Sequence, residues 1–298
     1  MPYRPKSTME QWRILQAVVD AGGYAQAADL LNKSQSSLNH AVAKLQSQLG
    51  VELLEVKGRK AFLTEAGEVM LRRSRFLTQQ IEDLELLASN LNMGWEPEIR
   101  IAVELVYPKQ ILYRALARFH PLSRGSRIQI IDTVITGSTE MILEHKADLV
   151  IAGSSSIPRG FMGEPLTVTQ MFPVVGPQHP LASEPSLDLN DLSQHLQIVI
   201  RDTASKPKDI GWLKAEQRWT VNNFFEALDI VRSGLGFCWL PDFIIQDALD
   251  AGQIVRLNIP LSSARVVPLS LVTPKEETLG PGSKQLRELL LAEHQQQE

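Results

Sequence analysis

The sequence predicts a multidomain α+β protein with a small, mainly helical head, one long helix and a larger α/β body. Two helical periods joined by a short polar turn occupy residues 24–49. A single helical period without proline then runs through residues 64–93. From residue 98 on, strand patterns alternate with helical ones, an order that predicts parallel strands connected by helices.

Composition sets the broad class of the protein. The chain has 298 residues, 44% of them hydrophobic, which is enough for two domains of roughly 150 residues each. Cys238 is the single cysteine, which excludes an intramolecular disulfide and a site with several cysteine ligands. It lies in the apolar run GFCWLP, which favours a buried small side chain; a redox-sensing thiol is the alternative. No secretory signal or bilayer-length apolar run occurs, so we expect a cytoplasmic protein.

Charge is distributed unevenly along the chain. Residues 1–75 contain eleven Lys and Arg against seven Asp and Glu, a net charge of +4. Since the whole chain carries −4, residues 76–298 carry −8. A basic head on an acidic body is typical of a phosphate-binding module attached to a second function.

The first two predicted helices bury small apolar faces. Residues 9–21 open with a capping box from Thr8 to Gln11 and end before two glycines. Residues 24–31 place Ala27 and Ala28 on one narrow face, where another helix can approach closely.

The third predicted helix, residues 35–49 with Ser34 as its N-cap, has two contrasting faces. Its buried stripe consists of Leu38, Val42, Leu45 and Leu49. Its outward face consists of Gln35, Ser36, Asn39, His40 and Ala43. Short polar side chains in the first two turns are typical of a recognition helix that meets base edges in the major groove, where Gln and Asn can bind adenine. The alternative is an ordinary helical hairpin with a solvated face.

Two short strands are predicted next. Residues 52–56 and 60–63 flank a tip formed by Lys57, Gly58 and Arg59. A basic tip suits a wing that lies along the sugar-phosphate backbone or in the minor groove. Hairpin tips can also be charged merely because they are exposed.

Residues 14–67 resemble the winged helix-turn-helix of the LysR-type transcriptional regulators. The resemblance is carried by Ala27 and Ala28, by SQSSLNHAVAKLQSQLGVELLE at 34–55 and by GRKAFLTEAG at 58–67. It implies a bacterial, nucleoid-associated protein that binds double-stranded promoter DNA. The DNA-contacting candidates are Ser34, Gln35, Ser36, Asn39, His40, Lys44, Lys57, Arg59 and Lys60.

Some positions depart from the family pattern. The family usually has Pro at Ser36, Ser at Asn39, and Arg at both His40 and Val56, whereas Arg59 is retained. Loss of two arginines predicts fewer charged contacts, or substitution of those contacts by Lys57 and Lys60.

Residues 64–93 form the long predicted helix, capped by Thr64. Its apolar positions are Ala66, Val69, Leu77, Ile81, Leu84, Leu87 and Leu91. A second copy of the helix is the simplest partner for this stripe, and the resemblance implies the same pairing, with homodimers that assemble into tetramers through their effector domains. The alternative is a helix that folds back on its own domain.

Residues 94–97 mark the boundary of the body. Its predicted strands are 99–103, 127–131, 147–151, 171–175, 197–200, 219–221, 234–241 and 265–272. IRIAV, ADLVIAG, GPQHPLA and SGLGFCWLP carry a looser resemblance to the family's two-lobe effector domain, which is similar in plan to periplasmic solute-binding proteins. We therefore expect a head at 1–64, a dimerisation helix at 65–94 and an effector domain at 95–298. Lobe I would span about 98–172 and 264–298 and lobe II about 173–263, with crossovers near 172–176 and 260–266.

A ligand would bind beyond the strand ends and at helix N-termini of the body. The candidates are Glu104, Tyr107, Thr136, Asp202, Thr203, Asn222 and Asn223. The segment ELVYPK after the first strand lacks Ser and Thr and contains an acid. Either the ligand is not a simple anion, or the second lobe supplies most polar contacts. Each candidate has the alternative of a capping or solvated loop residue.

No motif for catalysis, a metal or a cofactor occurs, so we expect no enzyme. The sequence predicts a DNA-binding regulator whose head spacing changes when a small-molecule effector closes the cleft. Contact with the transcription machinery stays open, and no membrane is expected. The alternative is a cytoplasmic small-molecule binding protein whose head contacts another protein, which the salt dependence of binding would distinguish.

Overall fold

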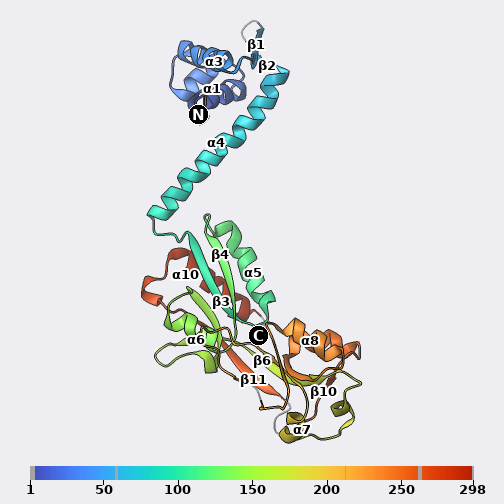
Figure 1. Ribbon diagram of the computed structural model, residues 1–298. Coiled ribbons are helices and arrows are strands. Elements are labelled where there is room, and N and C mark those ends of the chain that lie inside the picture. The colour runs from blue at the N-terminus through green and yellow to red at the C-terminus, as the bar shows by residue number, and fades with distance from the viewer. Residues whose placement is uncertain (1–3, 58–59, 212, 261–263, 297–298) are drawn as a thin grey trace. The chain divides into compact units, whose positions relative to one another are not determined.

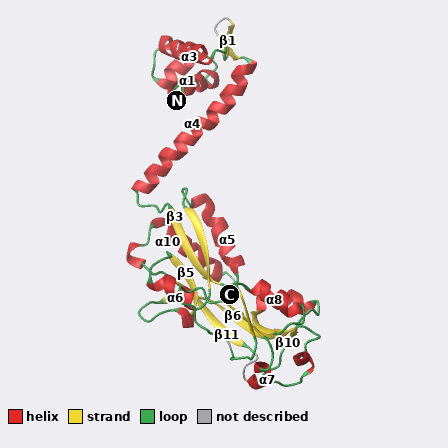
Figure 2. Ribbon diagram, viewed as in Figure 1, coloured by secondary structure: helices red, strands yellow, loops and turns green. Residues whose placement is uncertain are grey.

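The structure is a computed structural model that describes residues 4–57, 60–211, 213–260 and 264–296. Its contacts divide the chain into two compact units, Met1–Asn92 and Met93–Glu298 (Figure 1). We call them the head unit and the body unit and describe each by itself. The head unit is mainly helical, whereas the body unit combines a sheet with helices on its faces (Figure 2).

Three helices form the core of the head unit: α1 Met9–Asp20, α2 Tyr24–Leu31 and α3 Gln35–Leu49. The predicted capping box is present at Thr8 and Gln11, and Ser34 caps α3 as expected. Leu15, Val18 and Leu38 are completely buried where the helices meet. The three-helix part of the head prediction is therefore confirmed.

A two-stranded hairpin follows, with β1 Leu54–Lys57 antiparallel to β2 Lys60–Leu63. The Gln46 side chain fixes its start, because Oε1 accepts hydrogen bonds from the N–H groups of Leu53 and Leu54 over 2.7 and 2.9 Å. A Cβ on Gly67 would lie 2.0 Å from the Leu53 carbonyl oxygen. Only glycine therefore lets the next helix begin this close to the hairpin.

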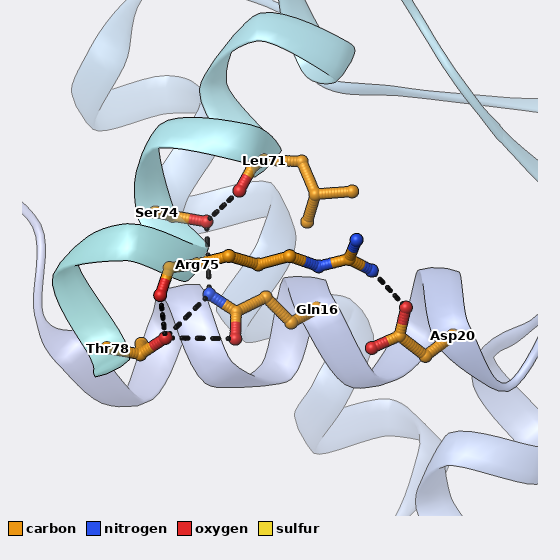
Figure 3. Close-up of polar contacts among 6 residues, drawn as sticks. All are labelled: Gln16, Asp20, Leu71, Ser74, Arg75 and Thr78. Carbon is orange, nitrogen blue, oxygen red and sulfur yellow. Dashed lines mark hydrogen bonds and ion pairs between the residues drawn. The ribbon is translucent and has the colours of Figure 1, made fainter. Parts of the chain in front are cut away.

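That next helix, α4 Glu65–Asn92, is attached to α1 by side-chain hydrogen bonds (Figure 3). The Gln16 amide donates to Ser74 Oγ over 3.1 Å and to Thr78 Oγ1 over 3.3 Å. An ion pair joins Arg75 to Asp20 beside them. Together with buried Leu71, these contacts make the first half of α4 part of the head unit.

The body unit is built on one mixed sheet, in which the described strands follow the order β4-β3-β5-β11-β6-β9-β7-β8, with β10 beside β6. The strands are β3 Glu98–Glu104, β4 Arg127–Thr133, β5 Leu149–Gly153, β6 Gly163–Val175, β7 Gln197–Ile200, β8 Arg218–Val221, β9 Phe237–Pro241, β10 Val255–Arg256 and β11 Arg265–Val272. β3 is parallel to β4 and β5, and β7 is parallel to β8 and β9, whereas β6 and β11 run antiparallel to their neighbours.

Strand β6 belongs to two halves of the sheet. Up to Met171 it pairs with β11, and from Met171 onward it pairs with β9. We call β4, β3, β5 and β11 half-sheet I, and β9, β7 and β8 half-sheet II. The change of partner falls one residue before the predicted crossover at 172–176. The strand itself begins at Gly163 rather than at the predicted residue 171.

Helices cover both halves of the sheet. They are α5 Lys109–Phe119, α6 Thr136–Leu143, α7 Leu189–Ser193, α8 Phe224–Arg232, α9 Asp242–Asp250 and α10 Pro281–Gln295, with short 3₁₀ turns at His120–Leu122, Ser154–Ser156, Pro180–Ser183 and Glu276–Thr278. Apolar side chains of α5, α8 and α10 share one core with the strands, including Leu112, Val231 and Leu290. The sequence did not predict α7, α9 or β10.

Candidate nucleic-acid interface and ligand cavity

The exposed face of α3 carries the predicted DNA-contacting residues. Among the exposed polar side chains of α3 are the candidates Gln35, Ser36, Asn39, His40 and Lys44. Leu38, Val42 and Leu45, completely buried, hold the opposite face in the head core. Because its buried stripe is fixed, α3 presents these polar groups on a rigid surface.

The N-terminal turn of α3 is ordered by its own hydroxyls. Ser34 Oγ accepts a hydrogen bond from the Ser37 N–H over 3.2 Å and lies 3.0 Å from Ser36 Oγ. Asn32 ends α2 in the left-handed conformation, at φ 53°, which allows the tight turn between the two helices. Local sequence therefore determines where α3 begins.

The hairpin places Lys57 opposite Lys60 across its tip. Arg59, also predicted to contact DNA, lies outside the described residues.

The body unit contains a half-open cavity of about 230 Å³ between the two half-sheets. It forms where β7 and β9 diverge, because these parallel strands share the single residue pair Gln197 and Phe237. Half-sheet I and its loops contribute Val106, Val134, Ile135 and Ser155. Half-sheet II contributes Ile198, Ile200, Cys238 and Trp239, and helix α8 contributes Phe224. Met171 and Arg265, paired at the point where β6 changes partner, also line the cavity.

Three of the predicted ligand residues meet beside this cavity. The carboxylate of Asp202, after β7, accepts hydrogen bonds from Thr136 Oγ1 and from the Gly137 N–H at the start of α6. Thr203 Oγ1 accepts one from the Val134 N–H over 2.8 Å. A Cβ on Gly137 would lie 1.9 Å from Thr203 Oγ1, so glycine is required for this approach. We call these contacts the interlobe clasp.

The clasp favours an ionised Asp202. Burial raises the pKa of this carboxyl, but hydrogen bonds from Thr136, Lys208, Ala204 and Gly137 outweigh it and hold the pKa below its usual value. Ile135, in the same loop, has φ 45°, a conformation that is strained for a β-branched residue. The N-terminus of α6 is thus occupied by a carboxylate of the chain itself.

Two further candidates are fully inside the fold. Glu104 accepts hydrogen bonds from the Gly153 N–H over 2.7 Å and from Ser138 Oγ over 3.2 Å, and burial raises its pKa. The Tyr107 hydroxyl lies 2.8 Å from His294 Nε2, and burial raises the pKa of Tyr107. Neither residue lines the cavity.

The last two candidates open helix α8. Asn223 is its N-cap, with Oδ1 accepting from the Glu226 N–H over 2.9 Å. The Asn222 N–H donates to the Glu226 carboxylate over 3.1 Å. Like Thr136, Asp202 and Thr203, they do not line the cavity itself.

The sequence missed the polar groups that do line the cavity. Arg265 places its guanidinium carbon 4.0 Å from the centre of the Trp239 ring, and burial lowers the pKa of this arginine. Cys238 is buried beside them, and burial raises its pKa to about 12, so it stays a thiol rather than the reactive thiolate at neutral pH. An arginine opening an otherwise apolar strand was the signal available in the sequence.

Within the described residues, no group of three His, Cys, Asp or Glu side chains could hold a metal ion. The same residues contain no helix that is long and apolar enough to cross a membrane.

Two family models match this chain. The LysR substrate binding domain matches residues 93–295, and the bacterial regulatory helix-turn-helix protein of the lysR family matches residues 9–68. The chain is 30% identical to the uncharacterized HTH-type transcriptional regulator YeeY of Escherichia coli K12, over 96% of this chain and 94% of that protein. It is 25% identical to the RuBisCO operon transcriptional regulator of Allochromatium vinosum, over 96% of each chain.

Solved structures show the same fold. The full-length Vibrio cholerae virulence activator AphB matches with a TM-score of 0.51 at 16% identity, covering 96% of this chain and 99% of that chain. The regulatory domain of MetR from N. meningitidis matches with a TM-score of 0.51 at 21% identity, covering 66% of this chain and 93% of that one. The chain therefore belongs to the LysR family of transcriptional regulators, which join a DNA-binding helix-turn-helix domain to an effector-binding domain.

Proposed function

We propose that α3 selects promoter sequences through its exposed polar face, while an effector bound between the half-sheets of the body unit alters how the heads are held on DNA. The observation that carries the first part is the contrast within α3. Asn39 is exposed, whereas its neighbour Leu38 is completely buried in the head core. A rigid helix with short polar groups in its first two turns fits base-edge recognition.

The first two turns of this face are mostly uncharged. Different residues would therefore determine which DNA sequence is selected and how tightly DNA of any sequence is bound. Asn39 and Gln35 can each bind adenine through two hydrogen bonds, and a good pair of this kind contributes about 1–3 kcal/mol of discrimination. Lys44 on α3 and Lys57 and Lys60 of the hairpin would bind phosphates, which strengthens binding to every sequence.

Selection of genomic DNA fragments tests this assignment. The test compares the wild type with Asn39→Ala, Lys57→Ala and Ser47→Ala at two salt concentrations. Ser47 is a matched control, because it is exposed on α3 but lies in its C-terminal part. Asn39→Ala should relax the selection, and Lys57→Ala should weaken binding to all fragments and reduce the salt slope by about one. Unchanged selection by Asn39→Ala would refute the assignment, and a salt-independent complex would favour a protein partner for the head.

The exposed apolar stripe of α4 supports self-pairing. Val69, Leu77, Leu84 and Leu91 are 47%, 53%, 64% and 44% exposed and recur every seven or eight residues. This spacing suits a helix that pairs with a copy of itself, and a symmetric pair would present two α3 helices to a pseudo-palindromic site. Light scattering should show Leu84→Glu shifted toward monomer, while Gln80→Glu, an exposed neighbour, keeps the wild-type mass. A wild-type monomer at micromolar concentration would rule the pairing out.

Coupling between effector and DNA requires two arrangements of the body unit. The interlobe clasp joins the loop after β7 to α6, and the cavity beside it touches both half-sheets. A ligand that contacts both half-sheets binds their closed arrangement more tightly than an open one, and this difference in affinity is what shifts the equilibrium.

A further inference from the structure

The cavity combines apolar walls with a single charge. Among the described residues that line it, Arg265 is the one ionisable group that carries charge at neutral pH. The rest of the wall is mainly apolar, as at Val134, Ile198 and Phe224, and includes the uncharged polar residues Ser155 and Gln197. Arg265 forms no ion pair with the carboxylates of the described residues. A half-buried guanidinium without a carboxylate partner is costly unless another group compensates its charge.

Trp239 also lines the cavity, and its ring lies beneath this guanidinium. Trp239 is 5% exposed, and its indole Nε1 has no hydrogen-bond partner among the described residues. The Arg265 guanidinium lies over its ring, at 4.0 Å from the centre. Buried polar groups normally find partners, so the Arg265 guanidinium, which lines the cavity and has no acceptor among the described residues, indicates that a ligand in the cavity supplies one.

The other anion-binding position of this region is already filled. The N-terminus of α6 would attract an anion, but Asp202 accepts the hydrogen bonds of Thr136 and Gly137 there. An external anion would have to displace this carboxylate. Arg265 therefore offers the more accessible positive charge.

The volume limits the size of the ligand. An apolar cavity of about 150 Å³ holds one benzene molecule. By proportion, the 230 Å³ here holds about nine or ten non-hydrogen atoms.

We infer that the cavity binds a small monocarboxylate with an apolar, ring-sized body, whose carboxylate is bound by Arg265 and whose body lies against the apolar side chains of both half-sheets. This inference rests on the proposed effector role of the body unit and names the class of ligand that the role requires.

Calorimetric titration of the full chain tests the inference with a matched pair of probes. Phenylacetate has ten non-hydrogen atoms, and 2-phenylacetamide has the same shape without the charge. The wild type should bind the acid at least about tenfold more tightly than the amide, because hydrogen bonds to a charged group are the stronger ones. Acetate, which lacks the apolar body, should bind far more weakly than phenylacetate.

Substitutions locate the effect. Arg265→Met keeps an apolar side chain over Trp239 and removes the charge, so the preference for the acid should fall to within about twofold. Arg256→Met is the matched control, because Arg256 lies over the Phe172 ring at 4.0 Å but does not line the cavity. It should keep the wild-type preference. If Arg265→Met does not fold, Arg265→Lys should retain a reduced preference, since Lys supplies charge without the planar fork.

Three results would overturn the inference: no binding of either probe at millimolar concentration, equal binding of acid and amide by the wild type, or a preference that survives Arg265→Met. The proposed function has its own readout in fragment selection. A preference that depends on Arg265 supports the ligand class even if no DNA fragment is selected.

Discussion

The head unit and the body unit present their functional groups in opposite ways. On α3, Gln35 and Asn39 are exposed, uncharged amides at the surface of a rigid helix. In the body unit, Arg265 is half-buried against Trp239 at the wall of a mainly apolar cavity. A DNA duplex is much larger than this cavity and carries its own charge, so the side chains that contact its bases must lie exposed on the protein surface. A small ligand gains affinity from being surrounded, and one enclosed charge can then dominate its selection.

The two sites also differ in what holds them. The α3 face is fixed by one buried stripe within a single helix. The cavity depends on contacts between segments far apart in the chain, including Asp202 with Thr136. A mutation in the buried stripe of α3 should therefore destabilise the whole head unit. A mutation in the interlobe clasp should instead weaken the contact between the two half-sheets of the body unit.

The largest expected effect tests the head scaffold. Leu38 is completely buried, so Leu38→Ala should lower the free energy of unfolding of the head unit by about 2–5 kcal/mol. Binding to every DNA fragment should fall with it. Chemical denaturation followed by circular dichroism measures the change. Asn39→Ala, at the adjacent exposed position, should change stability by less than about 0.5 kcal/mol. Equal losses for the two would mean that α3 is not fixed through one face.

The next effect tests the interlobe clasp. Asp202→Ala leaves the donors of Gly137, Ala204 and Lys208 without this acceptor and should destabilise the body unit by about 2–3 kcal/mol. Hydrogen exchange should rise at residues 134–140. Asp188→Ala is the control, because Asp188 caps only α7. It should weaken the start of α7 and leave exchange at 134–140 unchanged.

Gly137→Ala provides an independent test of the same contact. Its new Cβ would meet Thr203 Oγ1, so the clasp should open although every hydrogen-bonding side chain remains. Exchange at 134–140 should rise as it does for Asp202→Ala. Wild-type exchange in this variant would show that the loop after β7 does not hold α6.

A smaller effect tests the attachment of α4. Gln16→Ala removes the hydrogen bonds to Ser74 and Thr78 and should cost the head unit about 1 kcal/mol (Figure 3). Denaturation of residues 1–92 within the full chain, followed by hydrogen exchange, measures this loss. Gln79→Ala, whose side chain bonds only Asp83 on the exposed side of α4, should leave the head unit unchanged.

The smallest effect at neutral pH is the pH dependence that Asp202 gives to the stability of the clasp. Hydrogen bonds hold the pKa of Asp202 below its usual value of about 3.9. Its contribution is therefore complete above about pH 4 and is lost as the pH falls through the lowered pKa. Exchange at 134–140 should rise in acid in the wild type, and Asp202→Asn should flatten this dependence. A rise that begins near pH 6 would assign it to another group.

Sequence predicted the parts of the molecule that depend on neighbouring residues. Ser34 as N-cap, the capping box at Thr8 and the bounds of β7 and β11 follow from local patterns and are confirmed. The first part of β6 was missed, because GEPLTVTQ contains a proline and is paired by β11, about a hundred residues later.

The cavity could not be predicted from the sequence either, because it also depends on contacts between segments that are far apart in the chain. It arises from the divergence of β7 and β9, and its charge comes from β11. Thr136, Asp202 and Thr203 were chosen as polar residues at strand ends and helix starts, and they do meet, but Thr136 donates to Asp202 and Thr203 accepts from the Val134 N–H. Whether they also contact a ligand stays a prediction, as do Glu104, Tyr107, Asn222, Asn223 and the individual DNA contacts.

The central claim is that α3 of the head unit selects DNA and the cavity of the body unit binds a ligand. It is tested most directly by fragment selection with three proteins: the wild type, Asn39→Ala and Arg265→Met. If α3 reads DNA and the cavity serves a ligand, Arg265→Met selects the wild-type fragments, whereas Asn39→Ala loses that selection. If Asn39→Ala keeps the wild-type fragments, or Arg265→Met loses them while its melting temperature is unchanged, the assignment of the two sites is contradicted.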